Sequence, residues 1–285
     1  MLYKIHSLLM WFFLIGYFVV FLGIALKLHF LGNISVGVIF FFGAFFVSLG
    51  ILLQSSMLLS IRRSHDDLVK KNQQLLQTEN VTILALAYLA EMRDHETGAH
   101  LERTSCYVRL LGNELRKSGQ YADYVSPEYI DDIVKAAPLH DIGKVGIPDA
   151  ILRKPGKLTR EEFEIIKNHC DYGANILEMA EAKLEFQSFL RVAVKIVRSH
   201  HEKWDGSGYP DGLRNDEIPL SARIMALADV YDALRSERCY KKAFSHEEAC
   251  TVIAEGKGTH FSPDIVEAFM RSERQFRLVS TTLAD

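Results

Sequence analysis

The stretch that decides the fold of this chain is Leu139-His140-Asp141-Ile142-Gly143-Lys144. It places an imidazole beside a carboxylate, and Lys144 follows His140 at the spacing of one helical turn. A second adjacent pair, His200-His201, stands further along the chain. Neutral imidazoles and carboxylates are the usual ligands of divalent iron, manganese and zinc. The sequence therefore predicts a metal centre built around these two pairs.

Single residues add to this candidate set. Glu96 and His100 are four apart, so a helix would place them on one face, while His169 and Asp229 stand alone. The two pairs and Asp229 fall in apolar, Gly- or Ala-rich helical sequence, where a buried charge is costly unless it is paired or metal-bound. For four further histidines a hydrogen-bonded or solvated side chain is the expectation; these are His65, His95, His246 and His260.

The first 60 residues are a different kind of segment. They contain no acidic residue, and residues 8–28 and 34–59 are near-continuous apolar runs. Each run exceeds the roughly 20 residues that a membrane-spanning helix needs. A signal peptide is the alternative for the first run, but a second run follows at once and no small-residue cleavage pattern precedes it. Residues 1–60 are therefore predicted to form a two-helix transmembrane hairpin.

Basic residues near the spans predict the orientation of the hairpin. Four lysines and arginines between residues 62 and 71 follow the second span, against Lys27 and His29 beside the connecting turn. Cytoplasmic flanks carry the excess of Lys and Arg. Both termini, and everything after the hairpin, are therefore expected in the cytoplasm.

Residues 61–84 are predicted to be a connecting helix or a weak coiled coil. Residues 60–90 contain no Gly or Pro, and four leucines fit a heptad frame: Leu68, Leu75, Leu86 and Leu89. Asn72 and Glu79 occupy the intervening seam positions, where polar side chains cost stability while fixing register. A homodimer is favoured over a monomer, and both stay open.

Residues 85–285 are predicted to form one all-α domain, a helical bundle. Helical periodicity covers residues 99–117, 128–143, 171–200 and 221–235, and alternating strand patterns are scarce. Histidines on separate helices can converge as metal ligands inside such a bundle. The four cysteines show no paired spacing, so free thiols acting as small buried side chains are expected.

The charge of the soluble part excludes one class of partner. Residues 61–285 hold all 36 acidic residues and 31 of the 33 basic ones, a net charge of about −5. A protein that binds long nucleic acid should present a basic face. A phosphate-containing substrate would instead be held by metals and a few placed cations.

The ordered series of motifs resembles the HD-GYP domain, a bacterial subdivision of the HD metal-dependent phosphohydrolase superfamily. The likeness covers roughly residues 85–270 and is carried by RDHETGAH (93–100), LHDIGKVGIPD (139–149), His169, HHEKWDGSGYP (200–210) and ADVYDAL (228–234). An isolated His-Asp pair would be a weak signal, but this ordered series is a specific one.

The resemblance implies a phosphodiesterase that hydrolyses the second messenger cyclic di-GMP to pGpG, GMP or both. It implies metal ligands at Glu96, His100, His140, Asp141, His169, His200, His201 and Asp229. The expected cofactors are two or three divalent ions, iron or manganese, because family members that keep the residue at Glu96 resemble trinuclear sites. Asp141 is the residue expected to bridge two cations.

The same resemblance implies residues for the substrate and for a partner. Lys144 is expected at the reacting phosphate, and Arg238 and Lys241 at the second phosphate or a guanine, with solvated surface cations as the alternative for the last two. The loop Gly208-Tyr209-Pro210 either contacts diguanylate cyclase (GGDEF) domains or serves as a tight turn that positions the histidines. The location implied is the bacterial inner membrane.

Two rival functions stay open at this stage. One is an HD hydrolase acting on another cyclic dinucleotide. The other is a membrane-tethered receptor or adaptor that binds cyclic di-GMP without turnover. Loss of metal ligands would favour the receptor, and all eight ligand positions are filled here.

Overall fold

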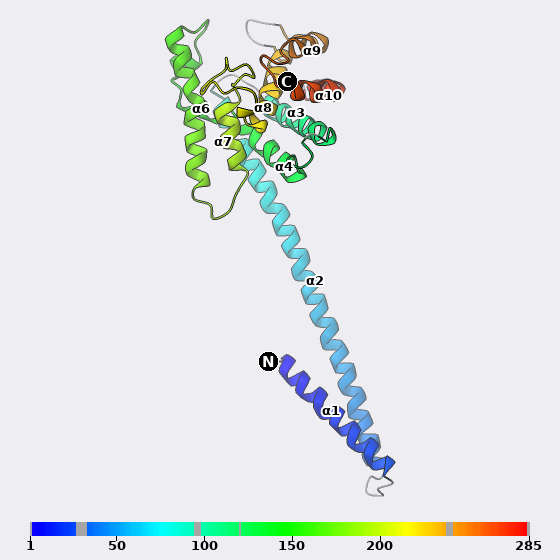
Figure 1. Ribbon diagram of the computed structural model, residues 1–285. Coiled ribbons are helices and arrows are strands. Elements are labelled where there is room, and N and C mark those ends of the chain that lie inside the picture. The colour runs from blue at the N-terminus through cyan, green and yellow to red at the C-terminus, as the bar shows by residue number, and fades with distance from the viewer. Residues whose placement is uncertain (1, 27–32, 94–97, 120, 238–241, 284–285) are drawn as a thin grey trace. The chain divides into compact units, whose positions relative to one another are not determined.

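The computed structural model describes residues 2–26, 33–93, 98–119, 121–237 and 242–283 (Figure 1). Every regular element among these residues is a helix, which confirms the all-α prediction. The chain divides into two compact units, Met1–Leu76 and Gln77–Asp285. The expected boundaries near residues 60 and 84 fall inside one continuous helix and stay predictions.

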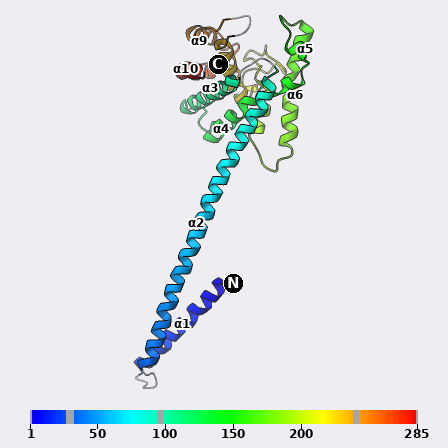
Figure 2. The same ribbon diagram turned by 180° about the vertical axis from the view of Figure 1, so that it is seen from behind.

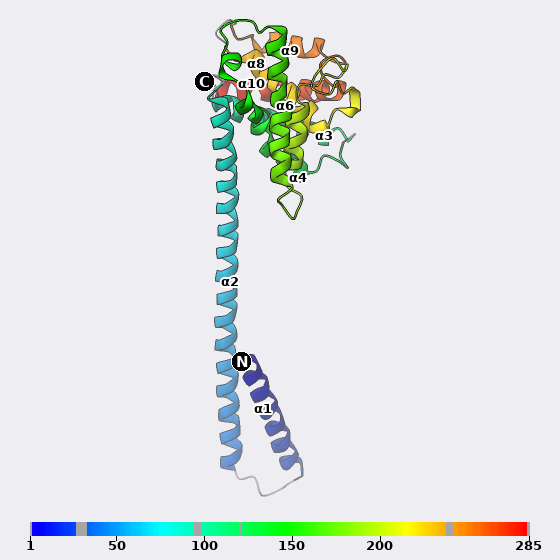
Figure 3. The same ribbon diagram turned by 90° about the vertical axis from the view of Figure 1, so that its left-hand side faces the viewer.

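The first unit contains α1 (Leu2–Ala25) and the beginning of α2 (Asn33–Glu91). The ribbon of α1 runs beside the beginning of α2 (Figure 3). The two helices pair through aromatic rings, with Phe13 stacked on Phe46 at 5.1 Å between centroids. Only one described segment, Val36–Glu91, is long and apolar enough to cross a membrane by length and composition. The described apolar part of α1, Met10–Ala25, is shorter. The described residues therefore contain one candidate span, and the two-span hairpin stays a prediction.

The connecting segment is helical, as the absence of Gly and Pro predicted, because it lies wholly within α2. Leu68 and Leu75 are exposed along it, as seam residues of a coiled coil would be in a single chain.

The second unit is a bundle built around α8, which packs against α3, α7, α9 and α10 (Figure 1). Figure 2 shows α3, α9 and α10 of this bundle from behind. After the end of α2 its helices are α3 (Gly98–Lys117), α4 (Pro127–Ala136), α5 (Asp149–Leu152), α6 (Arg160–Glu181), α7 (Leu190–Ser199), α8 (Leu220–Arg235), α9 (His246–Glu255) and α10 (Pro263–Thr282). Three short 3₁₀ turns connect them: η1 (Ala137–Leu139), η2 (Ile142–Gly146) and η3 (Asn215–Glu217).

An aromatic cluster fixes α8 against α3 and α10. Tyr107 stacks on Phe276 at 4.5 Å between centroids, and Tyr231 meets both rings edge-on at 5.1 Å. All three side chains are fully buried. Buried aromatic pairs contribute roughly 0.5–1.5 kcal/mol each beyond the apolar area that they bury. The cluster therefore holds α8 rigidly, and α8 carries one predicted metal ligand.

The predicted helix over residues 128–143 is wrong in its second half. Ser126 caps the start of α4 as expected, since its side chain accepts a hydrogen bond from the backbone N–H of Tyr129 at 3.1 Å. The α-helix stops at Ala136, because Pro138 has no backbone N–H to continue the helical hydrogen bonds, although Ala137 before it keeps helical dihedral angles. The chain continues as η1 and η2, with Asp141 between them. The predicted helix 171–200 is likewise divided into α6 and α7.

Gly143 permits η2 to lie directly against α6. A Cβ atom there would meet the carbonyl oxygen of His169 at 1.9 Å and the backbone N of Gly173 at 2.6 Å. Gly143→Ala is expected to destabilise the protein by about 1–3 kcal/mol, because two backbone segments must move apart. Chemical denaturation of the full chain in detergent measures this effect.

Gly112→Ala on α3 is the matched control for that substitution. Its Cβ would meet only the side chain of Ile130, at 3.1 Å, and the gain in helix propensity offsets that contact. We expect a change within about 1 kcal/mol for the control. Equal losses in the two variants would contradict the role given to Gly143.

Candidate metal centre

Seven of the eight predicted ligands lie in the described part of the chain, and five elements bring them together. They are His100 on α3, His140 and Asp141 between η1 and η2, His169 on α6, His200 and His201 at the end of α7, and Asp229 on α8. The eighth, Glu96, lies outside the described residues, as do the predicted substrate contacts Arg238 and Lys241.

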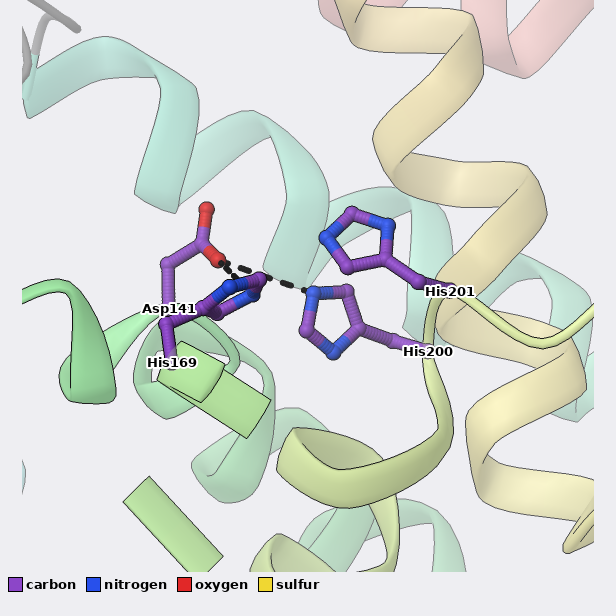
Figure 4. A group of neighbouring side chains, drawn as sticks. All are labelled: Asp141, His169, His200 and His201. Carbon is purple, nitrogen blue, oxygen red and sulfur yellow. Dashed lines mark ion pairs between the residues drawn. The ribbon is translucent and has the colours of Figure 1, made fainter. Parts of the chain in front are cut away.

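Asp141 approaches three histidines of this group, and Figure 4 shows it facing His169 and His200. Its Oδ1 is 3.2 Å from Nε2 of His169 and 3.6 Å from Nε2 of His200. Its Oδ2 is 3.3 Å from Nε2 of His140. Ligand atoms of Asp141, His169, His200 and His201 all lie within 4.8 Å of one another. The two carboxylate oxygens therefore face different histidines, as a carboxylate shared by two cations must.

A second group adjoins the first on the side of Asp229. Its Oδ1 is 3.8 Å from Nε2 of His100 and 3.9 Å from Nε2 of His140. Ligand atoms of Glu91, His100 and His140 also lie within 4.8 Å of one another. His140 thus belongs to this second group while Asp141, its neighbour in sequence, reaches into the first.

Sequence reasoning missed Glu91, which is 2% exposed at the end of α2. The available signal was a carboxylate directly after the apolar helical segment 83–90. A buried acid in such a segment needs a partner or a metal.

Backbone carbonyls fix the tautomers of three histidines. Nδ1 of His140 donates to the carbonyl of Ala137 at 2.9 Å, and Nδ1 of His169 to that of Ile166 at 2.7 Å. Nδ1 of His200 lies 3.0 Å from the carbonyl of Ile196. A carbonyl can only accept, so each Nδ1 carries the proton and each Nε2 presents a lone pair.

Buried ring nitrogens without hydrogen bonds indicate whether these residues could bind a metal ion. Within the described chain, Nε2 of His140 and Nε2 of His200 are buried and make no hydrogen bond. A buried polar atom without a hydrogen bond is costly in a folded protein. A divalent cation bound at each of these atoms would satisfy it, so the donor set fits metal ions.

Asp232 orients the fourth histidine and was also missed from the sequence. Its Oδ2 accepts from Nδ1 of His100 at 2.8 Å, and its carboxylate receives Nε and Nη2 of Arg103 at 2.7 and 2.9 Å. Burial would raise the pKa of Asp232, but His100 and Arg103 hold it below its usual value. The signal was its position three residues after Asp229 on one helix.

Electrostatics favour a cation at the centre. Burial would raise the pKa of Asp141, but Lys144, with Nζ 2.8 Å from Oδ2, and His140 hold it well below its usual value. Burial would lower the pKa of His140, yet the neighbouring Asp141 raises it to about 10. Burial and the charge of His200 hold the pKa of His201 well below its usual range. The centre thus holds an ionised Asp141 and a neutral His201, and a cation bound at Nε2 of His140 would replace the proton that Asp141 stabilises there.

Arg93 fixes the turn that carries Asp141 and Lys144. Its guanidinium donates to the carbonyl of Ile147 at 3.0 Å and pairs with the carboxylate of Asp149. Arg93, which follows the end of α2, thereby ties this part of the chain to η2 and the residues after it. The position of Lys144 therefore depends on contacts from a residue 51 positions earlier in the sequence.

The loop Gly208-Tyr209-Pro210 packs on the histidine pair. A Cβ atom at Gly208 would meet the backbone N of Lys203 at 2.3 Å, so the loop lies against the backbone that follows His201. The ring of Tyr209 lies 4.7 Å from that of His201. The structure therefore supports the positioning role that the sequence left open.

Known proteins are similar to the part of this chain that carries the candidate ligands. The family model for the HD domain matches residues 86–265. A protein of Vibrio cholerae named cyclic di-GMP phosphodiesterase is 51% identical over 220 residues, which cover 77% of this chain and 45% of the relative. A 3′3′-cGAMP-specific phosphodiesterase of the same species is 40% identical over 211 residues, covering 74% of this chain and 38% of the relative.

This chain therefore spans about half the length, or less, of these curated relatives. A solved structure of a cyclic GMP-AMP specific phosphodiesterase from V. cholerae matches with a TM-score of 0.50 at 21% identity. The match covers 72% of this chain and 51% of the solved chain, and it shows similarity of fold alone. Because the family model matches more than half of the sequence, over the helices that carry the histidine and aspartate cluster, the chain belongs to the HD domain family.

Proposed function

We propose that this chain is an HD-GYP phosphodiesterase that hydrolyses cyclic di-GMP to pGpG, GMP or both, and so lowers signalling by that messenger. The observation that carries the proposal is the position of Asp141, whose two oxygens face two groups of histidines. A carboxylate shared by two cations is the usual core of a phosphodiester-cleaving metal site. The relative with 51% identity supports cyclic di-GMP as the substrate.

The residues present fit two divalent ions, and iron or manganese suits a mixed imidazole and carboxylate set. Once bound, the ions would supply Lewis acidity toward the phosphodiester and an activated water as nucleophile. One ion would be held by Asp141 with His169, His200 and His201. The other would take His100, His140, Asp141 and Asp229.

A third ion is proposed at the edge of the second group. Glu96, outside the described residues, was the predicted ligand for it. The buried Glu91, whose carboxylate lies within 4.8 Å of ligand atoms of His100 and His140, supports a carboxylate-rich edge there.

Lys144 acts beside the ions. Its Nζ pairs with Asp141 at 2.8 Å, and its side chain is 12% exposed, so the ammonium group borders the centre and still has access to solvent. There it can hold a non-bridging phosphate oxygen as negative charge grows on it. Arg238 and Lys241 are proposed to bind the second phosphate or a guanine.

The N-terminal unit is proposed to anchor the enzyme in the bacterial inner membrane as a two-pass hairpin with both termini in the cytoplasm. The apolar segment that begins at Val36 supports one span, and α1 is assigned the other. The exposed leucines of α2 are proposed to pair two copies into a homodimer. The loop Gly208-Tyr209-Pro210 is proposed to contact diguanylate cyclase domains.

The relative that acts on 3′3′-cGAMP favours a second candidate function. A phosphodiesterase of the same fold specific for that mixed dinucleotide would use the same metal centre, because cleavage acts on the phosphodiester. The difference would lie in contacts to the bases.

Turnover of both dinucleotides by one preparation decides between these functions. The full chain, purified in detergent without oxygen and loaded with Fe²⁺ or Mn²⁺, is expected to release pGpG or GMP from cyclic di-GMP faster than it cleaves 3′3′-cGAMP. Chromatography of the products measures both rates. Cleavage of 3′3′-cGAMP alone would favour the second candidate, and binding of cyclic di-GMP without any cleavage would favour a receptor.

A further inference from the structure

A separate cluster of side chains that could bind a metal ion lies outside the candidate centre described above. His246 and Cys250 stand on α9 and Glu273 on α10, two helices that pack together near the C-terminus (Figure 1). Their ligand atoms all lie within 4.8 Å of one another. None of the three belongs to the catalytic cluster, and the sequence alone favoured a hydrogen-bonded histidine and a small buried thiol here.

The start of α9 fixes the positions of His246 and Cys250. A capping box between Ser245 and Glu248 fixes the first turn of α9, so His246 begins the helix in a defined orientation. Cys250 follows four residues later on the same helix face. Its Sγ lies 3.5 Å from Nε2 of His246, and Oε2 of Glu273 lies 2.6 Å from that nitrogen. A thiol and a carboxylate therefore converge on one ring nitrogen.

Tyr231 contacts the other ring nitrogen. Its hydroxyl lies 2.8 Å from Nδ1 of His246, and its side chain is fully buried. When Nε2–H donates to Glu273, Nδ1 accepts from the hydroxyl of Tyr231. With a cation on Nε2, the proton moves to Nδ1 and is donated to the oxygen of Tyr231. Such an outer partner is what holds a metal-binding imidazole in place.

The distances suit a tetrahedral ion after a small adjustment. Ligand atoms at zinc bond lengths of about 2.0–2.3 Å lie roughly 3.3–3.6 Å apart in a tetrahedron. Sγ of Cys250 and Nε2 of His246 have that separation already, at 3.5 Å. Glu273 would have to withdraw by less than about 1 Å, which its 32% exposed side chain permits.

We propose that His246, Cys250 and Glu273 bind one zinc ion, with water as the fourth ligand. A thiolate selects zinc over manganese and magnesium, so this site differs in preference from the candidate catalytic centre, whose ligands are imidazoles and carboxylates. The thiol proton passes to water when the ion binds, since the thiolate is the ligand. The bound ion ties α9 to α10 and thereby stabilises the C-terminal part of the bundle.

Cobalt(II) substitution tests the site, because a thiolate bound to Co²⁺ gives a charge-transfer band in the near ultraviolet. The full chain in detergent is titrated with Co²⁺ and compared with its Cys250→Ser variant. The matched control is Cys170→Ser, which removes a buried thiol lying 3.5 Å from Nε2 of His169 at the catalytic centre. We expect the band in the wild type and in Cys170→Ser, and its loss in Cys250→Ser.

Two further readouts separate a metal site from a purely structural cluster. Cys250→Ser is expected to bind one zinc ion fewer than the wild type while it keeps its helical content and its dinucleotide turnover. Glu273→Gln retains a partner for His246 and is expected to weaken Co²⁺ binding at least about tenfold. An absent band in the wild type, or a band unchanged by Cys250→Ser, would overturn the proposal. The site and its test do not depend on the catalytic function.

Discussion

Asp141→Asn in the full chain is expected to lower cyclic di-GMP turnover by about 10³-fold or more. The carboxylate has one oxygen 3.2 Å from Nε2 of His169 and the other 3.3 Å from Nε2 of His140. An amide offers one oxygen and an NH₂ group that cannot bind a cation, so it serves at most one of the two groups. Initial rates of product release, with metal content counted on the same samples, measure the effect.

Asp131→Asn is the control for this prediction. Asp131 lies on α4 with its side chain 61% exposed and pairs with the exposed Arg109. Surface ion pairs of this kind contribute about 0–1 kcal/mol, so turnover should stay close to that of the wild type. If Asp141→Asn kept its full metal content and more than about a tenth of the wild-type rate, the bridging role would be wrong.

Arg103→Leu is expected to lower the free energy of unfolding by about 3–5 kcal/mol. Arg103 and Asp232 are 4% and 1% exposed, and two hydrogen bonds of 2.7 and 2.9 Å join them. Removal of the guanidinium leaves the buried carboxylate with His100 and a long hydrogen bond from the hydroxyl of Ser236, and without its cationic partner. Because Asp232 also fixes the tautomer of His100, metal affinity should fall by about 10–100-fold.

Urea denaturation of the full chain in detergent, followed by circular dichroism, measures this loss. Arg109→Leu on the same helix is the control, because its guanidinium is 49% exposed and pairs only at the surface. The control should change stability by no more than about 1 kcal/mol. Adding Asp232→Asn to Arg103→Leu should recover part of the loss, since it removes the buried charge. Equal losses for Arg103→Leu and Arg109→Leu would contradict the account.

The convergence of the candidate ligands could be predicted from the sequence, because few residue types bind such ions and two adjacent pairs are uncommon. His140-Asp141 and His200-His201 indicated a centre before any fold was known, and the structure brings both pairs together. The all-α class followed from periodicity. These features are local, and local patterns are what a single sequence expresses most directly.

The partners of the ligands could not be predicted in the same way. Asp232 meets His100 and Arg103 only because α8 packs against α3, and Glu91 reaches the centre only through the way the end of α2 lies in the bundle. Such contacts depend on tertiary packing. The end of α4 was predictable in principle from Pro138, but the periodic apolar pattern continued past it.

The most direct test of the central claim counts metal and follows turnover on one sample before and after chelation. The Cys250→Ser chain serves here, so that the count reports the catalytic centre alone. The account predicts two or three iron or manganese ions per chain, loss of cyclic di-GMP cleavage on chelation, and recovery when Mn²⁺ or Fe²⁺ is added back. Undiminished cleavage by the metal-free chain would contradict it.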